Sequence, residues 1–225
     1  MATESVLQQH RRSTHRRIGF IGVSLVLLVA VSLLAVAIGP VTVRVSTVLE
    51  VLGGGGSPTE QAIVWNIRLP RVLAAIAAGA GLAVAGAAMQ TVLRNPLGAP
   101  YTLGISQAAA FGAAFSIVVF GLGAAGSGYL GSFAPYITTI AALLAALVST
   151  GIILLLVTYK RATPETMILT GVAIGSLFTA GMTLLQYFAS DTEVAAIVYW
   201  TFGDVGRPAW GQVALMTAIV VPALA

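Results

Sequence analysis

The sequence predicts an all-α membrane protein, a polytopic transmembrane helical bundle with about six spans, and three observations support this. Hydrophobic residues make up 58% of the 225 residues and charged residues only 8%, which is more apolar surface than a water-soluble core of ordinary size can bury. The charges are segregated, leaving long windows without Asp, Glu, Lys or Arg. Small residues recur at every fourth position in several windows, a spacing that lets membrane helices pack closely.

Residues 1–17 form a basic segment ahead of a membrane domain that we expect to cover 18–225. The basic residues nearest the first apolar window are Arg11, Arg12, Arg16 and Arg17. Under the positive-inside rule they indicate a cytoplasmic tail. A cleaved signal peptide is the alternative, because Ala35-Val36-Ala37 resembles a cleavage site, but the apolar run is longer than the core of a signal peptide.

Six apolar windows, separated by turn signals, are each expected to cross the membrane, because a helix rises 1.5 Å per residue. They lie near Ile18–Gly39, Val72–Leu93, Leu103–Gly123, Tyr136–Tyr159, Met167–Phe188 and from Gly211 onward. The third and fourth windows are separated by the Gly- and Ser-rich stretch Gly121–Pro135. Six crossings place both ends on one side, and the basic residues Arg94, Lys160 and Arg161 on the same side favour a cytoplasmic N-terminus.

Two longer segments on the opposite, outer side are expected to hold short helices. Pro40–Asn66 contains the amphipathic stretch Val45–Leu52, followed by the flexible run Gly53–Gly56. Ser190–Pro208 mixes acidic and aromatic residues and is too polar at its ends to span, so we expect an interfacial helix and a turn. Aromatic rings near span ends, such as Trp65, Trp200 and Trp210, fit interface anchors.

Small residues form ladders along one face of three spans. The positions are Ala75, Gly79, Ala83 and Ala87 in the second span, Gly104, Ala108, Gly112 and Ser116 in the third, and Gly171 and Gly175 in the fifth. Such ladders allow close helix–helix approach in lipid. They predict packing, and they are common to channels, transporters and inert bundles.

The residues needed for several chemistries are missing from the sequence. There is no GxxxxGK[ST] phosphate loop, so ATP hydrolysis by that mechanism is not expected in this chain. Cysteine is absent, and the two histidines, His10 and His15, lie in the basic tail without ligand spacing, so no metal or catalytic site is expected. The basic charge is explained by membrane anchoring, and no nucleic-acid partner is expected.

Ionisable groups at membrane depth usually mark ion-driven carriers. No acidic residue falls at the centre of a predicted span, and Glu165, at a span edge, is explained by a surface ion pair with Lys160 or Arg161. The polar residues within or at the ends of spans are Gln90, Ser106, Gln107 and Gln186, with several other hydroxyls. They either bind a neutral, hydrogen-bonding cargo or join helices.

Arg68 and Arg71 flank Pro70 at the outer end of the second span. Since proline suits the first turn of a helix, both guanidinium groups are expected at the rim on one side of that turn. One interpretation is that they reach to lipid headgroups. The other is that they receive carboxylates of an outside partner, which the guanidinium fork matches well.

Several motifs together resemble the FecCD family of type II ABC importer permeases, which carry iron-siderophore, haem and cobalamin. They are Arg68-Leu-Pro-Arg71, the Gly/Ala-rich helix ending in Gln90, Arg94-Asn-Pro-Leu-Gly-Ala-Pro100, Leu103-Gly-Ile-Ser106, Leu169-Thr-Gly-Val-Ala173 and Trp200-Thr-Phe-Gly203. The resemblance covers essentially the whole chain.

The resemblance implies a permease dimer, homomeric or heteromeric, that receives a chelate from a binding protein and is driven by two cytoplasmic ATPase subunits, which would hold ATP and magnesium. It implies docking at Arg68 and Arg71. It also implies two cytoplasmic gates, which would contain Asn95, Pro96, Leu97, Thr163, Glu165 and Thr166. No cofactor is expected in this chain.

Family members continue beyond six helices, so the resemblance also implies a truncated chain. The expected function is import of an iron(III)-siderophore by alternating access, by a non-enzymatic subunit of the cell membrane. Haem or cobalamin import is the alternative within the family. An ATP-independent transporter or channel, or a non-transporting membrane scaffold, is the alternative of another class.

Overall fold

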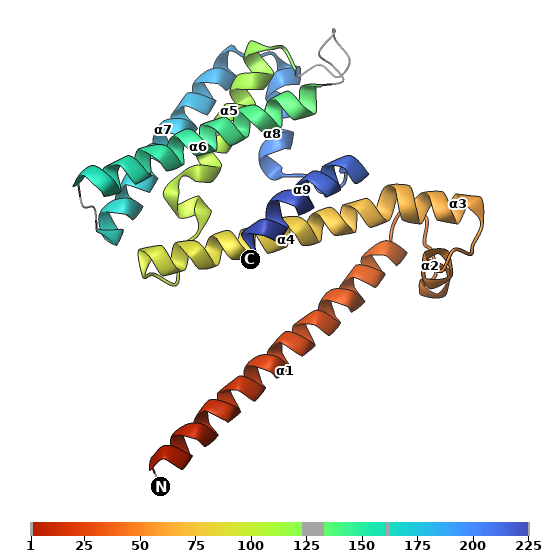
Figure 1. The fold of residues 1–225 in the computed structure, drawn as a ribbon. Coiled ribbons are helices and arrows are strands. Elements are labelled where there is room, and N and C mark those ends of the chain that lie inside the picture. Colours follow the sequence, from red (N-terminus) through yellow and green to blue (C-terminus); the bar gives the residue numbers. More distant parts are fainter. Residues whose placement is uncertain (1, 123–132, 161–162, 225) are drawn as a thin grey trace. The chain divides into compact units, whose positions relative to one another are not determined.

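The computed structural model describes residues 2–122, 133–160 and 163–224, and over these ranges every regular element is a helix (Figure 1). In chain order these are α1 (Ala2–Ala37), α2 (Val45–Leu52), α3 (Pro58–Gln61), the π-helix η1 (Ala62–Arg68), α4 (Leu69–Leu93), the 3-10 helix η2 (Pro100–Leu103), α5 (Ile105–Val119), α6 (Ala134–Lys160), α7 (Pro164–Phe188), α8 (Asp191–Phe202) and α9 (Trp210–Ala223). Arg161 and most of the turn expected at Gly121–Pro135 lie outside the described residues.

Within the described ranges, four helical stretches are long and apolar enough to cross a membrane: Thr14–Ala37, Pro58–Leu93, Pro135–Tyr159 and Pro164–Phe188. They correspond to the first, second, fourth and fifth predicted spans. The remaining two predictions correspond to the shorter apolar helices Ile105–Val119 and Trp210–Ala223. The sequence therefore located the helices correctly, although α5 is shorter than the window that predicted it.

The first helix begins at Ala2, well before the first predicted span. Residues 1–17 were predicted to be a tail. From Ala2 onward this segment is helical and continues directly into the apolar part of α1. The change at residue 17 is one of polarity, not of backbone conformation.

The second span belongs to a longer helix than expected, running from Pro58 through α3, η1 and α4 to Leu93. Ser57 begins it with a capping box, in which the Glu60 carboxylate accepts from the Ser57 N–H at 2.8 Å. Pro70 therefore lies inside a continuous helix, and the expectation that it marks a first turn is wrong.

The π-helical register of η1 explains why Pro70 does not end this helix. The N–H of Leu69 bonds to the carbonyl of Val64, five residues back. In the same register, the carbonyl that Pro70 cannot serve is that of Trp65, because proline has no N–H. The π segment before the proline therefore determines which carbonyl lacks a backbone N–H donor. In this register it is the Trp65 carbonyl, which another group can reach.

The chain divides into two compact units, residues 1–78 with 205–221 and residues 79–204 with 222–225. The first unit has an apolar core at the end of α1, in α2 and in η1. Its buried members are Val36, Ala37, Val43, Val48, Val51 and Val64. The predicted amphipathic helix Val45–Leu52 is confirmed as α2, and it buries Val48 and Val51.

In the second unit α5 is the central helix, packing against α6, α7 and α8. One apolar cluster joins Leu93, Leu103, Ile153 and Met167, and another joins Ala114, Ile117 and Ile197. The helix expected between Ser190 and Pro208 is confirmed as α8. It starts at a Ser190 capping box and is followed by Gly203, whose φ of 76° lies in the left-handed region that glycine tolerates.

Candidate functional site

Arg68 is buried in the first unit, and its guanidinium binds the carbonyl end of α1. Nη1 donates to the carbonyl oxygens of Val36 at 2.5 Å and Ala37 at 2.8 Å, and Nη2 donates to that of Val41. The side chain is only 7% exposed. Arg68 therefore holds together two segments of the chain that are far apart in sequence.

Arg71, one turn further along, is exposed. Since Arg68 is buried, the expectation that both guanidinium groups are presented together at a rim is wrong for Arg68. Docking of an outside partner by these arginines stays a prediction, and Arg71 has the exposure that it requires.

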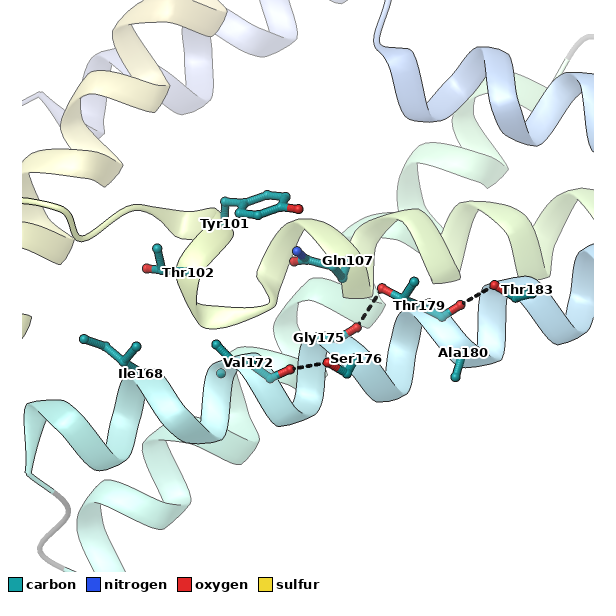
Figure 2. Close-up of a pocket in the computed structure, with 11 residues that line it drawn as sticks. Tyr101, Thr102, Gln107, Ile168, Val172, Gly175, Ser176, Thr179, Ala180 and Thr183 are labelled. Carbon is teal, nitrogen blue, oxygen red and sulfur yellow. Dashed lines mark hydrogen bonds between the residues drawn. The ribbon is translucent and has the colours of Figure 1, made fainter.

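The second unit contains an open groove of 640 Å³ between η2, α5 and α7. Gln107 of α5 lines it, together with Tyr101 and Thr102, and its role in a pathway or in helix packing stays a prediction. Figure 2 shows the amide of Gln107 between the ring of Tyr101 and the hydroxyl of Thr179 in this view. Gln107 Oε1 is buried and, within the described part of the chain, has no hydrogen-bond partner.

The α7 wall of this groove carries hydroxyls that the sequence analysis did not single out. Ser176, Thr179 and Thr183 line it, and each hydroxyl donates to a carbonyl four residues back, at 2.9–3.0 Å (Figure 2). Their oxygens keep the capacity to accept hydrogen bonds. The spacing of three to four residues placed them on one helical face and was the available signal.

A second groove of 470 Å³ lies between α4 and the segment 98–106. Gln90 and Ser106, two more of the four polar residues named from the sequence, line it. Tyr101 lines both grooves and is 69% exposed. Gln90, Ser106 and Gln107 therefore lie along two grooves that share one tyrosine, and the fourth residue, Gln186, is not among the residues that line either groove.

The first loop predicted as a gate follows α4. The Asn95 side-chain oxygen accepts from the Leu97 N–H at 2.9 Å, which closes a tight turn. Pro96 follows Asn95 in this turn, and Leu97 is 80% exposed. Arg94 has a φ of 47°, the left-handed conformation that reverses the chain here.

The second loop precedes α7, with Thr163 as the N-cap. Its hydroxyl accepts from the Thr166 N–H at 3.4 Å, and Glu165 lies exposed in the first turn. The suggested partner Arg161 lies outside the described residues. Both loops adjoin the same apolar cluster, since Leu93 precedes the first and Met167 follows the second. Gating by either loop stays a prediction.

Four glycines of the predicted packing ladders, Gly104, Gly112, Gly171 and Gly175, are in close contact with a neighbouring segment. A Cβ on Gly104 would lie 2.7 Å from the Gly171 carbonyl oxygen, and one on Gly175 would lie 3.2 Å from Gly104 Cα. A Cβ on Gly112 would lie 2.4 Å from the Ala141 carbonyl oxygen. These positions allow η2 and α5 to approach α7 and α6 at backbone distance.

The ladder on α4 has no such contact. A Cβ on Gly79 would meet nothing within 4 Å among the described residues. All four ladder positions are exposed: Ala75, Gly79, Ala83 and Ala87. Packing at Gly79 and Ala83 stays a prediction, and it would need a partner outside this chain's described residues.

No cluster of three or more potential metal-ligating side chains occurs among the described residues. The grooves offer amide and hydroxyl groups, and among the described residues no Asp, Glu, Lys, Arg or His lines them. Such walls suit an uncharged or fully chelated cargo better than a bare ion.

The fold defines the class of protein. A solved structure described as an inward-facing ABC transporter of metal-chelate type superposes with a TM-score of 0.70 and 27% identity, covering 91% of this chain and 58% of that chain. The fold is therefore that of type II ABC importer permeases. Residues 27–225 match the FecCD transport family, and the chain belongs to this family.

Curated relatives support that membership. A protein of Methanocaldococcus jannaschii named as an ABC transporter permease, MJ0087, is 48% identical over 96% of this chain and 62% of its own length. The vitamin B12 import system permease protein BtuC of Shigella boydii is 36% identical over 75% of this chain and 49% of its own length. The chain thus spans about half to three fifths of these relatives.

Proposed function

We propose that this chain is the membrane-spanning permease subunit of an ATP-driven importer that carries an iron(III)-siderophore chelate by alternating access. The observation that carries the proposal is the family membership, together with a groove lined by Gln107, Thr179 and Thr183 and, in the part of the chain that the structure describes, by no charged side chain. Iron inside a chelate needs no protein ligand, so amides and hydroxyls suffice to contact the organic shell.

Cobalamin is the second candidate cargo, because relatives 36% identical are named as vitamin B12 import permeases. Haem is the remaining candidate within the family. All three are large metal chelates whose organic shells can contact amides and hydroxyls. The structural neighbour is described as metal-chelate type, a term that fits all three and does not choose among them.

The proposed assembly contains a second permease, two cytoplasmic ATPase subunits that bind ATP and magnesium, and an extracytoplasmic binding protein. In this arrangement the basic start of α1 is cytoplasmic and Arg71 faces outward. The loops at Asn95 and Thr163 then lie on the cytoplasmic side, where their shared apolar cluster would let them move together.

The test is uptake by proteoliposomes that contain this permease with a candidate ATPase and a candidate binding protein from the same organism. We expect ATP-dependent accumulation of radiolabelled ferric siderophore, with cobalamin and haem as competing cargoes in parallel. Uptake of cobalamin alone would reassign the cargo. Uptake that persists without the ATPase, or that follows an ion gradient, would indicate an ATP-independent transporter.

A further inference from the structure

We infer that Tyr101 is a cargo-contacting residue whose phenol ring stacks on an aromatic donor group of the chelate, so that this permease favours ferric chelates of the phenolate type over all-hydroxamate ones. The inference deepens the proposed function and rests on it, because it takes the two grooves of the second unit as part of the pathway. It concerns the class of iron chelate that these grooves accept.

Tyr101 lies where the two grooves meet. Its side chain is 69% exposed and lines both grooves, whereas Leu103, two residues further along η2, is only 3% exposed. Gln107 lines the first groove with it and Gln90 lines the second. Figure 2 shows the Tyr101 hydroxyl on the side of Gln107 in this view. A cargo in either groove therefore meets this ring.

The Tyr101 ring has no partner of its own among the described residues. Over those residues its hydroxyl makes no hydrogen bond and its ring has no aromatic neighbour. By contrast, the ring of Phe111 in α5 packs on that of Phe178 in α7, with centroids 5.5 Å apart. The face of the Tyr101 ring is therefore open to the ring of a ligand, in the offset or edge-to-face arrangement that aromatic pairs prefer.

The turn that carries Tyr101 is held against α7 at backbone distance. A Cβ on Gly171 would lie 2.7 Å from the Thr102 carbonyl oxygen. The N–H of Gly104 donates to the Tyr101 carbonyl at 3.2 Å, and the Thr102 hydroxyl donates to the Ala99 carbonyl at 2.6 Å. Because the backbone on both sides of Tyr101 is fixed, its ring can bind a ligand at a small cost in conformational entropy.

The chemistry of the walls favours one class of iron chelate. Phenolate and catecholate donor groups are planar aromatic rings that can stack on the phenol of Tyr101, whereas hydroxamate donor groups are not aromatic. The amides of Gln90 and Gln107 can donate hydrogen bonds to the oxygens of the chelate. An iron complex of three catecholates carries several negative charges, and among the described groove residues no basic side chain offsets them. A phenolate chelate of low net charge fits both conditions.

The first experiment compares ATP-dependent uptake of a ferric phenolate siderophore and a ferric trihydroxamate by the proteoliposomes described above. Tyr101→Leu should lower uptake of the phenolate chelate about fivefold and leave that of the trihydroxamate nearly unchanged, because only the first loses a stacking partner. Tyr101→Phe keeps the ring and should transport both as the wild type does. Tyr159→Leu is the matched control, because Tyr159 is 82% exposed and lines neither groove.

The outcomes separate this inference from the proposed function. Equal loss of both chelates in Tyr101→Leu, or loss of neither, would overturn the role of the ring in selection. Uptake in Tyr101→Phe as low as in Tyr101→Leu would show that the hydroxyl, and not the ring, meets the cargo, and would also overturn it. A wild type that takes up neither chelate with ATP would refute the proposed function instead.

The second experiment needs no transport, so it decides the inference even in that last case. The tyrosines of the detergent-solubilised full chain are nitrated with tetranitromethane, and the products are located by mass spectrometry. An excess of the ferric phenolate siderophore should lower nitration of Tyr101 about fivefold, and the trihydroxamate should lower it much less. Nitration of Tyr159 is the internal control and should not change. Equal protection of Tyr101 by both chelates, or protection by neither, would overturn the inference.

Discussion

Gly104 and Gly171 are in backbone contact: a methyl group on Gly104 would lie 2.7 Å from the carbonyl oxygen of Gly171 and 2.9 Å from the backbone nitrogen of Gly175. Gly104 also has a φ of 72°, a conformation that side chains rarely adopt. The junction between η2 and α5 thus depends on Gly104 itself and on Gly171 and Gly175 of α7, which it contacts. This contact forms part of the groove at Tyr101 and Gln107.

Replacing Gly104 by Ala should destabilise the second unit by about 2 kcal/mol, from backbone strain together with overpacking. The measurement is thermal unfolding in detergent. Gly151→Ala is the control, because a Cβ there meets nothing within 4 Å and the residue lies within α6. Equal midpoints for the two variants would contradict the packing described here.

Gly112 and Gly79 should respond differently to Leu. Gly112→Leu should lower the unfolding temperature strongly, since even a Cβ would lie 2.4 Å from the Ala141 carbonyl oxygen. Gly79→Leu should leave the fold intact. If the α4 ladder meets a second permease, Gly79→Leu should instead shift the dimer toward monomer in light scattering, and an unchanged mass would argue that the ladder faces lipid.

Gln107→Leu should separate transport from stability. Because Gln107 Oε1 has no partner among the described residues, replacing the amide should cost little stability or gain about 1 kcal/mol. Uptake of the chelate should fall if this amide contacts cargo. Thr179→Val, of similar shape, probes the opposite wall, and normal uptake in both variants would exclude this groove from the pathway.

Thr163→Ala should lower the unfolding free energy by about 1 kcal/mol, through loss of the N-cap of α7. Thr163→Ser keeps an oxygen in that position and should be close to wild type. Both are measured by thermal unfolding. A Thr163→Ala variant as stable as the Ser variant would mean that the cap contributes little.

Trp210→Phe should weaken the first unit by about 1 kcal/mol, because it leaves the Trp65 carbonyl without the indole donor. The rings of Trp65 and Trp210 lie 6.2 Å apart, so the emission of Trp65 should also change. Trp200→Phe, in α8, is the control for losing one indole. Identical unfolding of the two variants would contradict the role of this hydrogen bond.

Local signals predicted much of the architecture. The apolar windows located the long helices, the amphipathic pattern located α2, and the mixed polar and aromatic segment Ser190–Pro208 was expected to hold the helix that the structure shows as α8. These features depend on residues a few positions apart, so spacing alone reveals them. Of the polar residues named from the sequence, Gln107 lines one groove and Gln90 and Ser106 line the other, whereas Tyr101 and the α7 hydroxyls were not singled out.

The error at Pro70, and the difference between two ladders of similar sequence, concern places where distant segments decide the outcome. Pro70 signals a helix start in isolation, yet the π register and the Trp210 indole let the helix continue through it. Gly79 and Gly112 belong to ladders that look alike in sequence, but only Gly112 meets a neighbouring helix among the described residues.

The sequence by itself determined that the chain is a helical membrane protein, where its long helices run, and to which family it belongs, because hydrophobicity and turn chemistry are local properties. Only the tertiary structure decided that Arg68 turns inward to the end of α1 while Arg71 stays exposed. The physical reason is that a guanidinium takes whichever acceptors lie nearest in space, and the carbonyls of Val36 and Ala37 come close only when the chain has folded.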